Sequence, residues 1–282
     1  MLERFGLYQN PDGTFQRLDT QRSIDAVNAE LNEIFQFNSN ITGSIIFTGA
    51  EAVNPVFQRI LENRGFESND IGNFHSRLTV GREIGGAAAY TGDLELGLGE
   101  TKDFVVFMSS QTRVSDFPIF LAEEIMHGQH IAEVINREGI SFEEYRNRFG
   151  VLTEEFLGYS GRKKIIEACG LEGKYGTDVE LKPGMTESDW GHLLGYFAVD
   201  DLFDRGIELP YRDLFRAPDE ETFWQILRDN TGTTVNYKFQ FPQSQDFTPL
   251  QDWLQRYINR CKADSFLQLK FSTVTAPQSP AE

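Results

Sequence analysis

The sequence predicts an α+β fold, in which an N-terminal part with a mixed sheet and helices precedes a mainly helical C-terminal part. Stretches typical of strands, with β-branched, aromatic or alternating apolar residues, fall in the first half at 44–48, 87–98 and 103–110. Apolar residues at helical spacing dominate the second half. Because the strands come first and the helices second, the order is that of an α+β protein and not of a repeating βαβ one.

The first half is also expected to contain two helices. Residues 22–37 form an amphipathic pattern, because their apolar side chains recur every three or four positions. These apolar residues are Ile24, Val27, Leu31 and Ile34. A second helix follows the strand at 44–48 and ends at Gly65, since glycine readily leaves the helical conformation. Residues 1–114 are therefore expected to form a subdomain of helices and strands.

The second half is expected to form a helical subdomain over 115–271. Its first helix has potential capping residues at its start, Ser115 and Asp116, and a glycine, Gly139, at its end. Further elements are expected as helices at 141–149, 152–168, 187–205 and 219–229, a late strand at 237–241 and a closing helix after it. The small, polar and proline-containing tail, 272–282, is expected to be disordered.

Composition and charge exclude several classes of protein. Of 282 residues, 43 are acidic and 26 basic, whereas binding to nucleic acid or to an anionic membrane surface needs clustered lysine and arginine. The apolar content of 40% is too high for a disordered chain, and no apolar run approaches the length of about 18 residues that spans a membrane. The N-terminus lacks the pattern of a signal peptide. We therefore expect a soluble, cytoplasmic protein with neither a nucleic-acid nor a membrane partner.

The sequence contains few cysteines and histidines, the residues whose sulfur or imidazole groups bind metals or act in catalysis. The two cysteines, Cys169 and Cys261, stand far apart, so they form no cysteine-pair motif, and the sequence leaves open whether they pair with each other. The chain has four histidines, and two of them, His127 and His130, are three residues apart. The helix that carries these two is therefore the first place to look for chemistry.

Residues 121–130 place several potential metal ligands on one helix. Glu123 and His127 are four residues apart, so they lie on one helix face and could grip one metal ion. Glu124 projects to the side, where it could act on a metal-bound water. His130 lies one turn beyond His127 and is an additional candidate, either as a ligand or as a residue that orients one.

The spacing on this helix resembles the His-Glu-x-x-His motif of zincin peptidases, with Glu123 in place of the first histidine. The segment Thr153-Glu-Glu-Phe-Leu-Gly-Tyr159 resembles the second-helix signature of gluzincin metallopeptidases, whose first glutamate is the third zinc ligand. By this match Glu154 is the third ligand, and Tyr159 corresponds to the aromatic residue of the signature. Residues 190–206 resemble a later gluzincin helix, which supplies a histidine or tyrosine to stabilise an oxyanion.

This resemblance implies a zincin-like metallopeptidase that hydrolyses peptide bonds. The metal ligands would be Glu123, His127 and Glu154, and the general base would be Glu124. His192 or Tyr196 would stabilise the tetrahedral oxyanion. The edge strand near 87–98 would pair with an extended peptide substrate, or with a segment of a protein partner.

The implied cofactor is a divalent metal ion, with zinc as the first candidate. Because Glu123 replaces a histidine, the site is rich in carboxylates, which also suit Fe(II) or Mn(II) and acidify a bound water less. Two alternatives to a peptidase therefore stay open. One is a catalytically inactive protein of the same fold that binds a peptide or protein partner, and the other is an Fe- or Mn-dependent enzyme. The substrate and the oligomeric state do not follow from the sequence.

Overall fold

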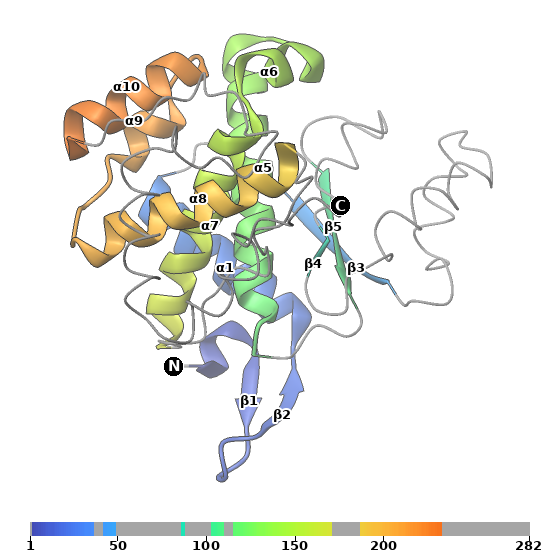
Figure 1. Cartoon of the computed structure of the whole chain (residues 1–282). Helices are drawn as coiled ribbons and strands as arrows, with labels where there is room; N and C mark the ends of the chain where they lie inside the picture. Colours follow the sequence, from blue (N-terminus) through green and yellow to red (C-terminus); the bar gives the residue numbers. More distant parts are fainter. Residues whose placement is uncertain are drawn as a thin grey trace, which may run out of the picture. The chain divides into compact units, whose positions relative to one another are not determined.

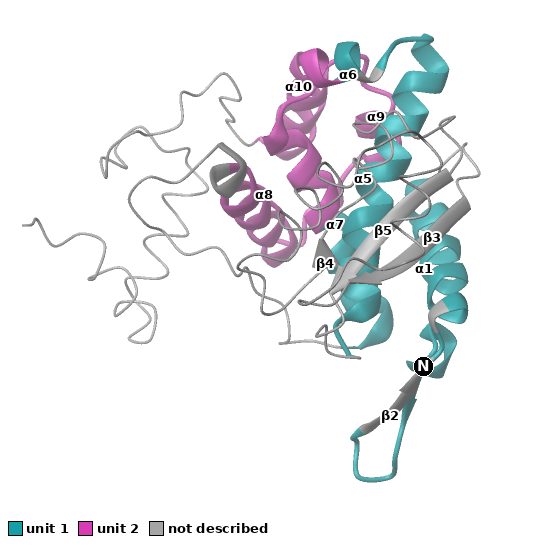
Figure 2. Cartoon of the chain, turned by 90° about the vertical axis from the view of Figure 1, so that its right-hand side faces the viewer, with its two compact units in different colours: residues 1–145, 160–174 teal, residues 146–159, 175–282 magenta. Residues whose placement is uncertain are grey.

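The computed structural model describes residues 2–36, 42–48, 86–87, 103–109, 115–170 and 187–232. The chain divides into two compact units (Figure 2). Unit 1 contains residues 1–145 and 160–174, and unit 2 contains residues 146–159 and 175–282. The division falls within helix α7 (Val151–Cys169), so the first half of this helix belongs to unit 2 and the second half to unit 1.

The strands that the structure describes all belong to unit 1 (Figure 1). A 3₁₀ helix, Leu2–Phe5, leads into an antiparallel hairpin of β1 (Leu7–Gln9) and β2 (Phe15–Leu18). Strand β3 (Thr42–Thr48) pairs in parallel with β5 (Asp103–Ser109), and the two-residue strand β4 (Gly86–Ala87) pairs antiparallel with β5. Strand pairing among the described residues thus consists of a hairpin and a three-stranded sheet in the order β3-β5-β4.

Helix α1 (Thr20–Phe35) confirms the amphipathic helix that the sequence predicted at 22–37. Its first turn is capped by Asp19, whose carboxylate accepts a hydrogen bond from the backbone N–H of Arg22 at 3.1 Å. Its apolar side is buried, as Val27 and Leu31 show with no exposed surface. The helix ends at Gln36, which adopts a left-handed conformation with φ of 52°.

Helix α5 (Phe117–Glu138) carries most of the residues predicted to be functional and packs against α1 within unit 1 (Figure 1). Its start after Asp116 and its end at Gly139, with φ of 65°, were predicted correctly. The expected cap at its start is not formed, because Asp116 makes no side-chain cap hydrogen bond and Ser115 donates to Asp116 instead. Most residues of α5 up to Val134 are buried, among them the polar Glu123 and Glu124. Other elements therefore cover this helix on most of its sides.

The described part of unit 2 consists of helices around an aromatic core. Its helices are the first half of α7 together with α8 (Glu187–Asp204), α9 (Tyr211–Phe215) and α10 (Glu220–Thr231), while α6 (Phe142–Arg148) crosses the division between the units. Phe156 of α7 contacts Phe223 and Trp224 of α10 edge-to-face, with ring centroids 5.9 and 5.5 Å apart. All three side chains are fully buried, so they fix α10 against α7.

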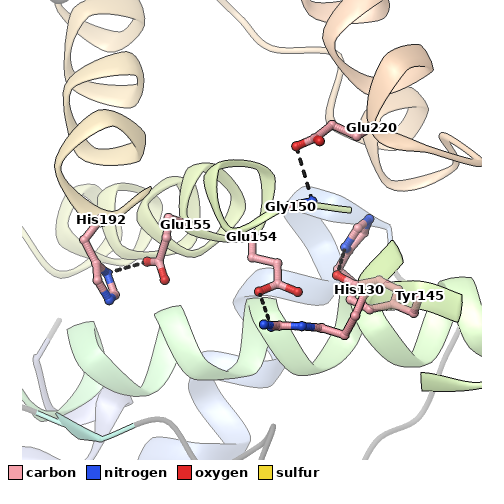
Figure 3. Close-up of polar contacts among 8 residues, drawn as sticks. His130, Tyr145, Gly150, Glu154, Glu155, His192 and Glu220 are labelled. Atoms are coloured by element: carbon pink, nitrogen blue, oxygen red, sulfur yellow. Dashed lines mark hydrogen bonds and ion pairs between the residues drawn. The ribbon is translucent and has the colours of Figure 1, made fainter. Parts of the chain in front are cut away.

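The start of α7 is also tied to α10 by a polar contact. The Oε1 atom of Glu220 accepts hydrogen bonds from the Thr153 hydroxyl at 2.5 Å and from the backbone N–H of Gly150 at 3.3 Å (Figure 3). A carboxylate at this end of a helix satisfies free N–H groups and interacts favourably with the helix dipole. This contact fixes the turn of α7 that carries Glu154 and Glu155.

Glycines allow two pairs of helices to approach very closely. A Cβ atom on Gly195 of α8 would lie 2.8 Å from the Cβ of Glu155 and 2.9 Å from the backbone of α7. In unit 1, a Cβ on Gly161 of α7 would lie 2.3 Å from the Cγ of Met126 and 3.1 Å from the carbonyl oxygen of Ala122 in α5. Both contacts leave no room for a side chain, so the helix backbones nearly touch at these points.

The predicted α+β, zincin-like fold is wrong, because the described residues are mostly helical. The buried apolar residues that the structure describes lie mostly on helices, and α5 buries them on several of its sides. The edge strand expected at 87–98 is represented by Ala87 alone, in the two-residue strand β4. The expected helix ending at Gly65 and the elements and tail expected after residue 232 lie outside the described residues.

The close approach at Gly195 leads to a stability prediction. We expect Gly195→Ala to lower the free energy of unfolding by about 1–3 kcal/mol, because overpacking against the α7 backbone exceeds the gain in helix propensity of about 1 kcal/mol. Chemical denaturation followed by circular dichroism measures this change.

Gly191 offers a matched control one turn earlier on α8. Its added Cβ would meet mainly the side chain of Val151, at 2.4 Å from Cγ1. We therefore expect Val151→Ala to restore the stability of Gly191→Ala but not that of Gly195→Ala. Equal rescue of both variants would contradict a backbone contact at Gly195.

Candidate metal centre

A glutamate–histidine pair joins helices α7 and α8 in unit 2 (Figure 3). The Nδ1 atom of His192 lies 2.7 Å from Oε2 of Glu155, so the two side chains form an ion pair when the imidazole is protonated. The Glu155 side chain is 10% exposed and that of His192 is 31% exposed. Gly195 lies one turn after His192, so the near contact of the two backbones brings this pair within reach.

Two tyrosines restrict the orientation of the His192 ring. Tyr159 meets His192 edge-to-face with an angle of 86° between the rings, and it packs in the same manner on Tyr196, with centroids 5.6 Å apart. Tyr159 follows Glu155 by one turn of α7, and Tyr196 follows His192 by one turn of α8. Both tyrosines are buried, so they support the imidazole with an aromatic surface beside its contact with Glu155.

In unit 1, Glu123 of α5 pairs with Arg162 of α7. The Nη1 atom of Arg162 lies 3.2 Å from Oε2 of Glu123, and each side chain is less than a tenth exposed. The guanidinium carbon of Arg162 also lies 4.7 Å from the ring centroid of Phe120. Because a buried carboxylate without a counter-charge is costly, Arg162 offsets the charge of Glu123.

Glu123, Glu155 and His192 form a group that could hold a metal ion. Each residue offers one ligand atom, and these atoms lie within 4.8 Å of one another. Two carboxylate oxygens and one imidazole nitrogen are donors suited to divalent cations. The described residues thus contain a candidate metal centre of two glutamates and one histidine.

This group only partly overlaps with the predicted ligands. It shares Glu123 with them, but it does not contain His127 or Glu154. Glu154 precedes Glu155 by one residue, which turns its side chain about 100° around the helix axis. There its Oε2 lies 3.3 Å from Nη1 of Arg146, and that contact is drawn in Figure 3. Sequence reasoning gave Glu155 no role, because it stands where the gluzincin signature has a small residue.

The other predicted residues have varied surroundings. Glu124 of α5 is buried, at 5% exposed, and His127 is half-buried. The Nδ1 atom of His127 has no hydrogen-bond partner among the residues that the structure describes. His192 was expected to stabilise an oxyanion together with, or instead of, Tyr196, whereas its contact with Glu155 favours a place among the ligands. The predicted roles of Glu124 and His127 stay predictions.

His130, an additional candidate in the sequence, forms a buried polar contact of its own. Its Nδ1 lies 2.9 Å from the Tyr145 hydroxyl, and the two rings meet edge-to-face (Figure 3). Burial lowers the pKa of His130 from 6.5 to about 3, with smaller contributions from Arg137 and His127. His130 is therefore a neutral imidazole near neutral pH, and its ring contacts the Tyr145 side chain.

The lowered pKa of His130 predicts a specific dependence of stability on pH. Between about pH 3 and pH 6.5 the unfolded chain binds a proton at this residue and the folded chain does not, so the free energy of unfolding falls as the pH is lowered. His130→Asn, which keeps a polar group without titrating, should flatten this dependence. Urea denaturation of both proteins at several pH values measures the two slopes, and parallel slopes would contradict the prediction.

Comparisons with known proteins add no family to this description: no family model matches the chain, and no curated protein or solved structure is significantly similar to it. Among the described helices, none is long and apolar enough to cross a membrane.

Cys169 is a buried free thiol, and burial raises its pKa to about 12, so it is unreactive near neutral pH. Cys261 lies outside the described residues.

Proposed function

We propose that the chain binds a divalent metal ion through Glu123, Glu155 and His192 and uses it in a hydrolytic reaction. The observation that supports this most directly is the 2.7 Å contact between Glu155 and His192, two side chains from different helices. Glu123 supplies a third ligand that is buried and held by Arg162.

The number of ligands favours catalysis over a structural role. Structural zinc sites are closed by four protein ligands, whereas catalytic sites use three and keep a position open for water or substrate. The three ligands proposed here leave such a position. The His192 side chain, at 31% exposed, gives the site access to solvent, while the two carboxylates are shielded from it.

The donor set guides the choice of metal. Two carboxylates and one imidazole are the same types of donor that the sequence predicted, although two of the three residues differ. Zinc remains the first metal to test, and the oxygen-rich set makes Mn(II) and Fe(II) the next two. A bound ion would supply an acidified water and a polarised carbonyl group.

Other residues near these ligands in the sequence would complete the chemistry. Glu124 is the candidate general base, because its buried carboxylate is adjacent to Glu123 on α5. Tyr196 is the candidate donor to a developing oxyanion, since His192 is used as a ligand. Peptide bonds are the first substrate class to test, on the resemblance of residues 153–159 to the gluzincin signature.

A second candidate function rests on the same contact without a metal. A carboxylate beside histidine Nδ1 favours the ring tautomer whose proton is on Nδ1, in which Nε2 can act as a base. The 2.7 Å separation of Glu155 and His192 suits such a pair. A protein that only binds a peptide or protein partner is the remaining alternative. Metal binding separates the first proposal from both of these.

The proposed ligand set predicts which substitutions abolish metal binding. We expect Glu155→Gln and His192→Gln each to weaken binding of Zn²⁺ or Mn²⁺ at least about 100-fold, because even residues that merely orient ligands contribute about 10–100-fold. Isothermal titration calorimetry on the full chain measures the affinities. Wild-type protein that binds neither Zn²⁺, Mn²⁺ nor Fe²⁺ would contradict the proposal.

Glu154→Gln and His127→Gln are matched controls for this experiment. They make the same chemical changes at residues of the sequence-predicted set that lie outside the group of three. We expect both to leave metal affinity within about threefold of wild type, since each would remove no direct metal bond. Loss of binding in these two variants, with binding kept in Glu155→Gln, would assign the site to the sequence-predicted ligands instead.

A further inference from the structure

We propose that Arg162 is a positioning residue for Glu123, which holds one carboxylate oxygen and leaves the other to bind the metal ion. The inference rests on the proposed function, because it concerns how one of its three ligands is held. Arg162 is not a ligand itself, since a guanidinium group has no lone pair to donate.

The contact between Arg162 and Glu123 is fixed by the packing around it. Arg162 directly follows Gly161, where α7 approaches α5 so closely that a Cβ would lie 3.1 Å from the carbonyl oxygen of Ala122. Ala122 in turn directly precedes Glu123. The two charged residues therefore flank the tightest point of this helix pair, and both side chains are less than a tenth exposed. Such packing leaves little freedom for either side chain.

The atoms in contact determine which part of Glu123 is available. Nη1 of Arg162 lies 3.2 Å from Oε2, so the described contact occupies one of the two carboxylate oxygens. A carboxylate has about four lone-pair positions on two oxygens, so Oε1 can bind a cation while Oε2 keeps its ion pair with Arg162. Carboxylate ligands in metal sites are commonly oriented by such neighbouring side chains.

Phe120 explains why the residue is arginine. The guanidinium carbon lies 4.7 Å from the Phe120 ring centroid, and Phe120 is one turn before Glu123 on α5. A planar guanidinium group can stack on a ring and donate sideways to a carboxylate at the same time, whereas a lysine ammonium group is a point charge without this geometry. Phe120 and Glu123 together thus hold the Arg162 head group from two sides.

Positioning and charge make opposite predictions for the removal of Arg162. A fixed positive charge close to the site repels a cation, so charge alone predicts tighter metal binding when arginine is replaced by a neutral residue. Positioning predicts weaker binding, because Glu123 loses the ion pair that orients its carboxylate. The sign of the change therefore distinguishes the two effects.

The test compares metal binding by four variants of the full chain with that of wild type. The variants are Arg162→Gln, Arg162→Lys, Phe120→Leu and, as a control, Lys164→Gln. Lys164 lies on the same helix and pairs with Glu167 at 3.3 Å, so its replacement makes the same change of charge away from Glu123. Titration with Mn²⁺, followed by electron paramagnetic resonance of the free ion, gives the affinity, and the absorption spectrum of bound Co²⁺ reports the coordination geometry.

We expect Arg162→Gln to weaken Mn²⁺ binding at least about 10-fold and to change the Co²⁺ spectrum, with Lys164→Gln unchanged. Arg162→Lys should restore binding only in part, and Phe120→Leu should weaken it less than Arg162→Gln does. Unchanged or tighter binding by Arg162→Gln would overturn the inference while the proposed function stands. If that variant does not fold, wild-type affinity and spectrum in both Arg162→Lys and Phe120→Leu would overturn it. Absence of metal binding by wild type overturns the proposed function, and this inference with it.

Discussion

The near contact of helix backbones at two glycines is the constraint on which the rest of the structure depends. Gly195 brings α8 against the backbone of α7 in unit 2, and Gly161 brings α7 against α5 in unit 1. Side chains next to such contacts are carried into the interior whatever their polarity. Glu155 is itself part of the first contact, and Glu123 and Arg162 adjoin the second. The glycines thus determine which charged residues are buried.

Burial of these acidic residues creates a need for counter-charges. Four glutamates of α5 and α7 are less than a tenth exposed, namely Glu123, Glu124, Glu154 and Glu155. An unpaired buried carboxylate costs several kcal/mol, so each needs a positive or hydrogen-bonding partner. Arg162, Arg146 and His192 lie beside Glu123, Glu154 and Glu155, respectively. These four glutamates are a small part of the 43 acidic residues in the chain. A cation bound beside them could supply positive charge in place of the basic side chains of the protein.

The sequence predicted local structure well, since local patterns determine it. Apolar spacing located α1, and Gly139 marked the end of α5. The choice between Glu154 and Glu155 could not be predicted in this way. Adjacent helix residues point about 100° apart, and which of them faces α8 depends on the contact at Gly195, a long-range feature. The paired glycines Gly191 and Gly195, spaced by one helical turn, were the available signal for that contact.

The same dependence on long-range packing explains why the fold class was mistaken. Strand-like segments were counted as a sheet because each has the right composition, yet composition does not reveal how much of the core a sheet will supply. Among the described residues, most of the buried apolar side chains lie on helices. The candidate metal group lies on the helices that carry the sequence motifs, α5, α7 and α8, but two of its three residues differ from the predicted ligands.

The charge of the proposed centre connects its unusual ligands with Arg162. A divalent ion held by two neutral histidines and one glutamate, the usual gluzincin set, carries one net positive charge, which acidifies its water. With two glutamates and one histidine the net charge is zero, and the water would be less acidic. Arg162, at 3.2 Å from Glu123, brings the sum back to one positive charge. In the proposed centre the guanidinium would thus offset the charge of the second carboxylate, and the oxygen-rich set would then be compatible with the proposed hydrolysis.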